Sequence, residues 1–253
     1  MLDLQKEQTA KINCSLEHFR TSSFGFDSLN LEVTERGQLS KPQLKASLQA
    51  SQGTFNHIEI DSSIIRTQLD LSQNTLFLPF QFVCQGKIDK GPFSIDLAGE
   101  FQENEANSQS LLLQSLTFSL DKKKAQLIQP SSLYLSEKEV TLSPLNIAWE
   151  NNGQLLCSAK ITDDSLSGTF LAQACPLDFL HFLFPETYIS GNVSANGSLQ
   201  GSKIAPELHL SLKTKSLVIG TQKQDFLFPF DLHLSCDVDE KSAAVTGEIY
   251  TKA

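Results

Sequence analysis

Several residue types are scarce in this 253-residue chain, and each shortage excludes a class of protein. Basic residues are few, because 20 Lys and Arg stand against 29 Asp and Glu, a formal net charge of −9. A nucleic-acid-binding protein needs a basic face to displace counterions from phosphates, so we expect no nucleic-acid partner. Charged residues are 19% of the chain and hydrophobic residues 40%, and this apolar content excludes an intrinsically disordered protein.

Long apolar runs are also missing. No segment approaches the 18 uninterrupted apolar residues that a membrane-spanning helix requires. Asp3, Lys6, Glu7 and Lys11 stand where the apolar core of a signal peptide would lie, so the N-terminus does not resemble one. A strand-like pattern still runs at residues 247–253, and we therefore expect the chain to be a fragment of a longer protein.

Residue patterns that carry chemistry are absent as well. The five cysteines are scattered, and no Cys-x-x-Cys pair occurs. The chain contains no Gly-x-Ser-x-Gly elbow, no glycine-rich phosphate loop and no His-Glu-x-x-His sequence. We therefore predict a protein that is not an enzyme and that has no metal site and no cofactor.

The aromatic residues that are present are almost all Phe. Seventeen Phe accompany one Trp and three Tyr, and there is only one Met. Phe contributes apolar area without a polar group, which suits a dry surface.

Apolar residues alternate with other residues along many short segments. This period of two is the strand period. The two longest examples lie at residues 76–84 and 226–238, and Gly, Asn, Asp or Pro separates many of the segments. We predict that one face of these strands lines a shared apolar interior, made by Leu76, Leu78, Phe80, Phe82, Phe226, Phe228, Phe230, Leu232 and Leu234.

One segment has the pattern of a short helix. Pro176 stands where a first helical turn tolerates proline, and Pro185 would end the helix, which predicts about two turns near residues 176–184. The sequence otherwise predicts an all-β chain with many short antiparallel strands, about one for every 8–12 residues. We expect one continuous segment over residues 1–253, with a repeat division near residues 102–125.

The sequence contains an internal repeat. Gly37-x4-Pro42-x-Leu44 recurs as Gly201-x4-Pro206-x-Leu208. A short helix, a strand around Gly191, a strand ending at Gly201 and then Pro206-x-Leu208 together resemble the recurring unit of the TamB/AsmA-like proteins of the translocation and assembly module. The resemblance covers residues 145–215 and extends to residues 30–100.

This resemblance implies a fold, a place and a function. The fold would be an elongated antiparallel β-taco, a repeating β-groove with an apolar interior. The location would be the bacterial periplasm, with the full-length protein anchored in the inner membrane through a segment absent here. The hydrophobic groove would carry phospholipid acyl chains between inner and outer membranes in lipid transport, or serve outer-membrane biogenesis with an Omp85-type partner that contacts parts outside this chain.

Two other interpretations remain open from the residues alone. The apolar face could be the fully packed core of a structural or adhesive β-repeat domain that binds no lipid. A β-helix enzyme would need a cluster of carboxylates on the polar face, and the densest set is Asp231, Asp237, Asp239 and Glu240. His209 and His233 also fall on the polar side, and we expect them to face each other across a hairpin.

Overall fold

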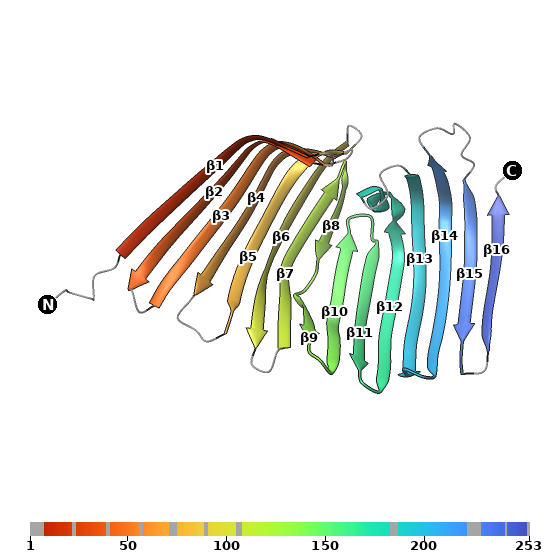
Figure 1. Cartoon of the computed structure of the whole chain (residues 1–253). Helices are drawn as coiled ribbons and strands as arrows, with labels where there is room; N and C mark the ends of the chain where they lie inside the picture. The colour runs from red at the N-terminus through yellow and green to blue at the C-terminus, as the bar shows by residue number, and fades with distance from the viewer. Residues whose placement is uncertain are drawn as a thin grey trace. The chain divides into compact units, whose positions relative to one another are not determined.

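The computed structural model describes residues 8–21, 24–38, 41–55, 58–70, 75–88, 91–104, 108–182, 187–221, 229–240 and 242–251. These residues are almost entirely antiparallel β-strand, which confirms the predicted all-β class (Figure 1). The chain divides into two compact units, Met1–Lys124 (unit 1) and Ala125–Ala253 (unit 2).

Unit 1 is a sheet in which each strand pairs antiparallel with the next strand along the chain. Alternating apolar residues and polar turns produce this meander, since consecutive antiparallel strands need only short connections. The strands are β1 (Gln8–Arg20), β2 (Phe24–Gln38), β3 (Lys41–Phe55), β4 (Ile58–Asp70), β5 (Phe77–Ile88), β6 (Gly91–Asn104) and β7 (Ser108–Leu120).

Unit 2 repeats the meander, and β8 contains the boundary between the units. Here β10 pairs with β8, β9 and β11, and the later strands pair in chain order. The elements are β8 (Lys123–Leu127), β9 (Ser131–Leu135), β10 (Glu139–Trp149), β11 (Gln154–Thr162), β12 (Ser165–Pro176), the 3-10 helix η2 (Leu177–Phe182), β13 (Thr187–Ser202), β14 (Pro206–Thr221), β15 (Phe230–Val238) and β16 (Ala243–Thr251).

The short helix predicted near residues 176–184 is present as η2, a 3-10 helix rather than an α-helix. The predicted strand spacing was too short, because most strands here are 12–16 residues long rather than 8–12 with their turns. Serine, threonine and glutamine extend the strands beyond their apolar residues where no turn residue interrupts the backbone. The length of an apolar segment therefore underestimates the length of its strand.

The repeated Gly-x4-Pro sequence forms the same local structure in each unit. Gly37 pairs with Pro42 at the end of the β2–β3 hairpin, and Gly201 pairs with Pro206 at the end of the β13–β14 hairpin. Gly201 has a φ of 106°, in the left-handed region where glycine carries no Cβ penalty. The repeat therefore marks a hairpin turn.

The strands of unit 1 bend sharply near one end. His18 in β1 and Gln52 in β3 have left-handed φ angles of 55° and 48°, and the β4–β5 register shifts at Asp61. Such irregularities increase twist and bend a strand. Figure 1 shows the strands β1 to β4 turning over near one end. Ala50 and Cys84, which stand beside the bend, are only 4% and 5% exposed, so the sheet bends toward their side.

Unit 2 also has backbone irregularities in adjacent strands. They leave some backbone amides without a partner in the neighbouring strand, and side-chain oxygens of unit 2 accept hydrogen bonds from these amides. Ala174 and Ser216 have left-handed φ angles, and Gly191 has a φ of 114°. The amide of Ala174 donates to Oγ of Ser194 (3.0 Å), and the amide of Ser216 donates to Oδ1 of Asp231 (2.7 Å). Because the freed amides find acceptors, the register can shift at low cost.

Candidate functional site

Unit 1 has one apolar face and one polar face, because paired residues of adjacent strands point to the same side. One row of paired residues crosses all seven strands and is apolar throughout. Two of its inner members, Leu31 and Ile65, remain 38% and 42% exposed. The row consists of Cys14, Leu31, Leu48, Ile65, Phe82, Leu97 and Leu116.

Unit 2 has the same division, and two apolar rows lie next to each other across β10 to β16. Phe170 in the first row and Leu234 in the second are each 38% exposed. The first row consists of Leu145, Cys157, Phe170, Gly197, Leu210, Cys236 and Val245. The second consists of Ile147, Leu155, Ala172, Ala195, Leu212, Leu234 and Gly247.

One end of the apolar face in unit 2 is covered. Ala172, Cys175 and Ala195 are buried there, and Trp149 packs against them. The helix η2 contributes Phe179, and the centres of the Phe179 and Trp149 rings lie 6.0 Å apart. Among the described residues, no large side chain is fully buried. The apolar rows therefore form a partly open surface.

The predicted lining residues belong to both units. In unit 1, Leu78, Phe80 and Phe82 lie on the apolar face of β5, and Leu76 stands just before that strand, 37% exposed. In unit 2, alternate positions of β15 lie on the apolar face, namely Phe230, Leu232 and Leu234. Phe226 and Phe228 lie outside the described residues. A single interior shared by both groups stays a prediction.

The sequence interpretation did not name several residues of these rows. Leu31, Leu48, Ile65 and Leu116 occupy the same row as Phe82. Their segments alternate for fewer residues and contain Ser, Thr or Ala at apolar-face positions, so the period of two is weaker there. The pairing register identifies them because it connects each one to a strongly alternating strand.

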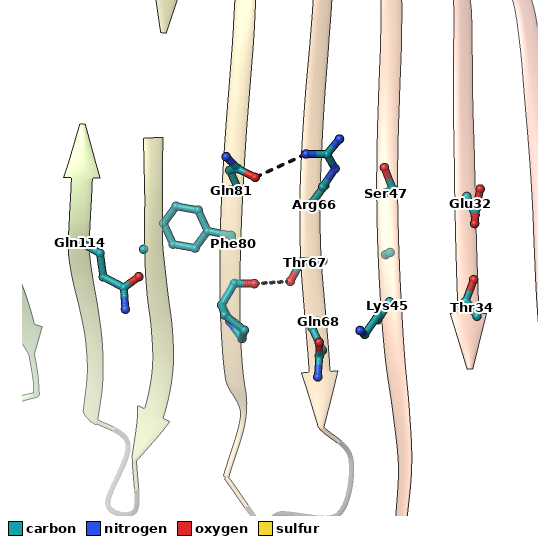
Figure 2. A pocket seen from close by; sticks show the side chains of 13 residues that line it. Glu32, Thr34, Lys45, Ser47, Arg66, Thr67, Gln68, Phe80, Gln81 and Gln114 are labelled. Atoms are coloured by element: carbon teal, nitrogen blue, oxygen red, sulfur yellow. Dashed lines mark hydrogen bonds between the residues drawn. The ribbon is translucent and has the colours of Figure 1, made fainter. Parts of the chain in front are cut away.

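The polar face of unit 1 has a shallow depression with a volume of about 540 Å³ (Figure 2). Its side chains mix opposite charges with amides, including Glu32, Lys45, Arg66 and Gln81. Nη1 of Arg66 donates to Oε1 of Gln81 over 3.5 Å, a long hydrogen bond between exposed side chains. The depression is open, and Phe80 and Pro79 also line it, so its lining is mixed rather than purely polar.

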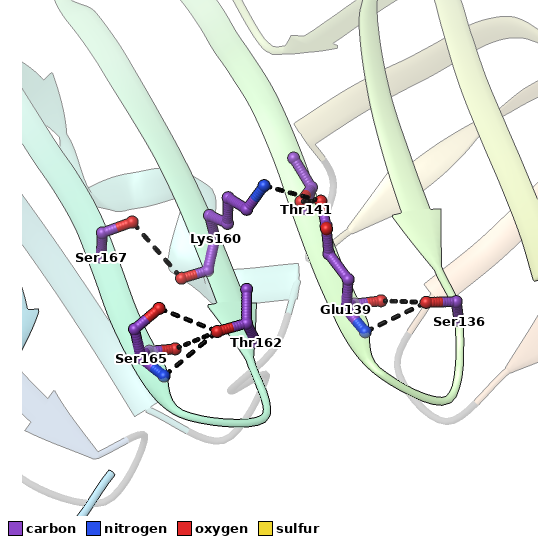
Figure 3. A network of polar contacts seen from close by, with 7 residues as sticks. All are labelled: Ser136, Glu139, Thr141, Lys160, Thr162, Ser165 and Ser167. Carbon is purple, nitrogen blue, oxygen red and sulfur yellow. Dashed lines mark hydrogen bonds and ion pairs between the residues drawn. The ribbon is translucent and has the colours of Figure 1, made fainter. Parts of the chain in front are cut away.

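The polar face of unit 2 carries an ordered network near one hairpin end (Figure 3). Oε1 of Glu139 accepts hydrogen bonds from the Thr141 hydroxyl (2.6 Å) and from Nζ of Lys160 (3.1 Å). These hydrogen bonds, led by that of Thr141, lower the pKa of Glu139 from its ordinary 4.5. In the same region, the Thr162 and Ser165 hydroxyls lie 2.8 Å apart.

Three of the four carboxylates considered for an enzyme site have separate hydrogen-bond partners. Asp231 accepts from the Ser216 amide, Asp237 lies 2.8 Å from Nδ1 of His209, and Asp239 accepts from the Ser242 amide at 2.7 Å. Within the described ranges, no group of three or more His, Cys, Asp or Glu side chains is arranged to hold a metal ion.

The expectation that His209 and His233 face each other is wrong. His209 pairs across the strands with Asp237, whereas His233 pairs with Lys213 and lies edge-on to Tyr250 with ring centres 5.2 Å apart. Alternation predicts the face on which a side chain lies, but it does not predict the residue opposite to it.

Burial changes the chemistry of the cysteines on the apolar face. Desolvation raises the pKa values of the Cys84, Cys157 and Cys175 thiols above their ordinary value. In Cys175, hydrogen bonds to the carbonyls of Gln173 and Gln154 oppose this effect. These thiols therefore behave as small apolar side chains.

In the described part of the chain, no helix has the length and apolar character needed to cross a membrane. No protein-family model, curated protein or solved structure matches this sequence. The TamB/AsmA-like resemblance accordingly stays a prediction.

Proposed function

We propose that the apolar face of each unit is a binding surface for phospholipid acyl chains and performs no catalysis. The observation that carries the proposal is the row from Cys14 to Leu116, which is apolar across seven strands while Leu31 and Ile65 inside it stay about 40% exposed. A packed protein core excludes water from such positions.

The energetics favour a long, flexible apolar ligand. Each buried methylene group contributes about 0.8 kcal/mol, so an acyl chain gains affinity in proportion to the number of strands that it crosses. Adjacent strands lie about 4.8 Å apart, and the rows continue from strand to strand without a charged member. A compact polar ligand would gain nothing from this repetition.

The bend of unit 1 supports the same proposal. It turns the sheet toward the apolar side, beside Ala50 and Cys84, and so shelters part of the apolar face from water. A face that is sheltered in part and exposed in part suits a ligand that must be both held and released along its length.

For the whole protein we propose a TamB/AsmA-like role, in which such faces pass phospholipid through the periplasm between the inner and outer membranes. The net charge of −9 is consistent with this role, because it disfavours nonspecific adhesion to anionic membrane surfaces. An Omp85-type partner would link the protein to outer-membrane biogenesis.

The experiment is native mass spectrometry of the chain purified from a bacterial host without detergent, with phospholipid extraction from the same sample. The proposal predicts adducts of phospholipid mass that chloroform–methanol extraction recovers. A lipid-free mass, together with a high and lipid-independent melting temperature, would instead support a structural or adhesive β-repeat domain.

A further inference from the structure

The connection between β12 and β13 is longer than a hairpin requires. Antiparallel neighbours can be joined by a turn of about two residues, and β11 and β12 are joined by Asp163 and Asp164 alone. The β12–β13 connection instead contains η2, and Figure 1 shows this helix coiled at the end of the two strands. The helix therefore does more than connect the strands.

The helix stands where the apolar face of unit 2 has its smallest side chains. In the second apolar row, Ala172 and Ala195 pair with each other and have leucines as their outer neighbours. The two alanines are nevertheless only 4% and 6% exposed. Trp149 packs against them, Phe179 of η2 packs near Trp149, and η2 also contacts β13, which carries Ala195. Side chains of Trp149 and η2 thus take up the space that two small residues leave.

Two observations indicate that this cover is weakly held. An isolated helix as short as the six residues of η2 is not stable in water, so η2 depends on its contacts with the sheet. The indole N–H of Trp149 is buried there and has no hydrogen-bond partner in the described part of the chain. Because an unsatisfied buried donor is costly, the covered state is not an optimised core. A competing apolar ligand can therefore displace the helix.

We propose that η2 is a displaceable lid. In the lipid-free protein η2 closes the second apolar row at Ala172 and Ala195, and an acyl chain that reaches β12 and β13 displaces η2 and contacts Trp149 in its place. The acyl chain competes in proportion to the number of methylene groups that it buries. The first row stays open beside the lid, since Phe170 is 38% exposed. The lid rests on the function proposed above, whereas lipid binding does not depend on the lid.

The first test uses the fluorescence of Trp149, the only tryptophan of the chain. The intact, delipidated chain is titrated with phosphatidylcholine whose acyl chains are brominated, and with the same lipid without bromine as the control. Bromine quenches tryptophan at contact distance, so the lid predicts quenching by the brominated lipid alone. Bound brominated lipid, recovered by extraction, that leaves Trp149 unquenched overturns the lid and not the proposed function. If no lipid binds, the proposed function is contradicted and the lid with it.

The second test compares the same substitution on the lid and on the open row. Calorimetric titration with a soluble short-chain phosphatidylcholine measures the dissociation constant of each variant. Phe179→Ala weakens the lid, so the constant should fall about three- to tenfold, whereas Phe170→Ala removes a lipid-binding ring and should raise it. Without lipid, the Trp149 emission should shift to longer wavelength in Phe179→Ala only. A dissociation constant that is unchanged or higher in Phe179→Ala overturns the lid.

Discussion

Leu210 and Ser211 are neighbours in β14 that lie on opposite faces of the sheet. Leu210 pairs with Gly197 and Cys236 in an apolar row, whereas Ser211 pairs with Asn196 and Ser235. Both side chains are half-buried. Substitutions at these two positions therefore differ in the face of the sheet that they change and not in the exposure of the side chain.

Leu210→Asp should therefore lose bound lipid and still fold. Water can reach a carboxylate on an open face, so we expect a destabilisation of about 1–2 kcal/mol rather than the larger cost of an unpaired buried charge. Ser211→Asp, the control, should retain its lipid. Lipid extraction and urea denaturation provide the two measurements. An unfolded Leu210→Asp variant, or one with full lipid content, would contradict an open apolar face.

Trp149 should tolerate replacement by Phe. Its indole N–H is buried and has no hydrogen-bond partner among the described residues, while its ring packs near Phe179. Because an unsatisfied buried donor costs about 1–3 kcal/mol, Trp149→Phe should be neutral or should raise the free energy of unfolding. Trp149→Ala should lower it by about 3 kcal/mol. A loss in Trp149→Phe as large as that in Trp149→Ala would show that the N–H is satisfied.

The Glu139 network should contribute to stability above acidic pH. The folded pKa of Glu139 is lowered, so its contribution is complete above the unfolded value of 4.5 and is lost as the pH falls through the folded pKa. In melting temperatures measured from pH 7 to pH 3, Glu139→Gln should reduce the acid-induced decrease. Glu150→Gln, in an exposed turn, is the control, and an identical pH profile for all three proteins would count against the network.

Thiol alkylation should follow the burial of the cysteines. Cys14 is exposed, whereas Cys84 and Cys175 are buried with raised pKa values. A raised pKa lowers the thiolate fraction at a given pH, so iodoacetamide should modify Cys14 first. Because Cys14 belongs to an apolar row, added phospholipid should slow its modification. Mass spectrometry of tryptic peptides measures both effects, and rapid labelling of Cys84 would contradict the burial described here.

The alternation of residues predicted which side chains share a face, but not where the strands bend. Leu78, Phe80 and Phe82 lie on one face of β5, because their period of two matches the period of a strand. The left-handed conformations at His18 and Gln52 have no such signal, since neither residue is a glycine. They depend on the pairing of neighbouring strands, as does the partner of His209.

The openness of the candidate site was not predictable from the sequence. An apolar row has the same sequence pattern whether or not a second layer covers it. The two cases differ in the exposure of the row's members, such as Leu31 and Ile65, and exposure is known only from the structure. The weakly alternating strands β2 to β4 also supply part of the row. Their contribution is visible only through the register that connects them to β5.

The most direct test of the central claim is site-specific photo-cross-linking along β6 in living bacteria. A photoreactive amino acid is placed in turn at Ser94, Ile95, Asp96 and Leu97, whose side chains alternate between the two faces. If the apolar face binds acyl chains, phospholipid should cross-link at Ile95 and Leu97 and not at Ser94 and Asp96. Cross-links of equal intensity at all four positions, or at none, would contradict the account.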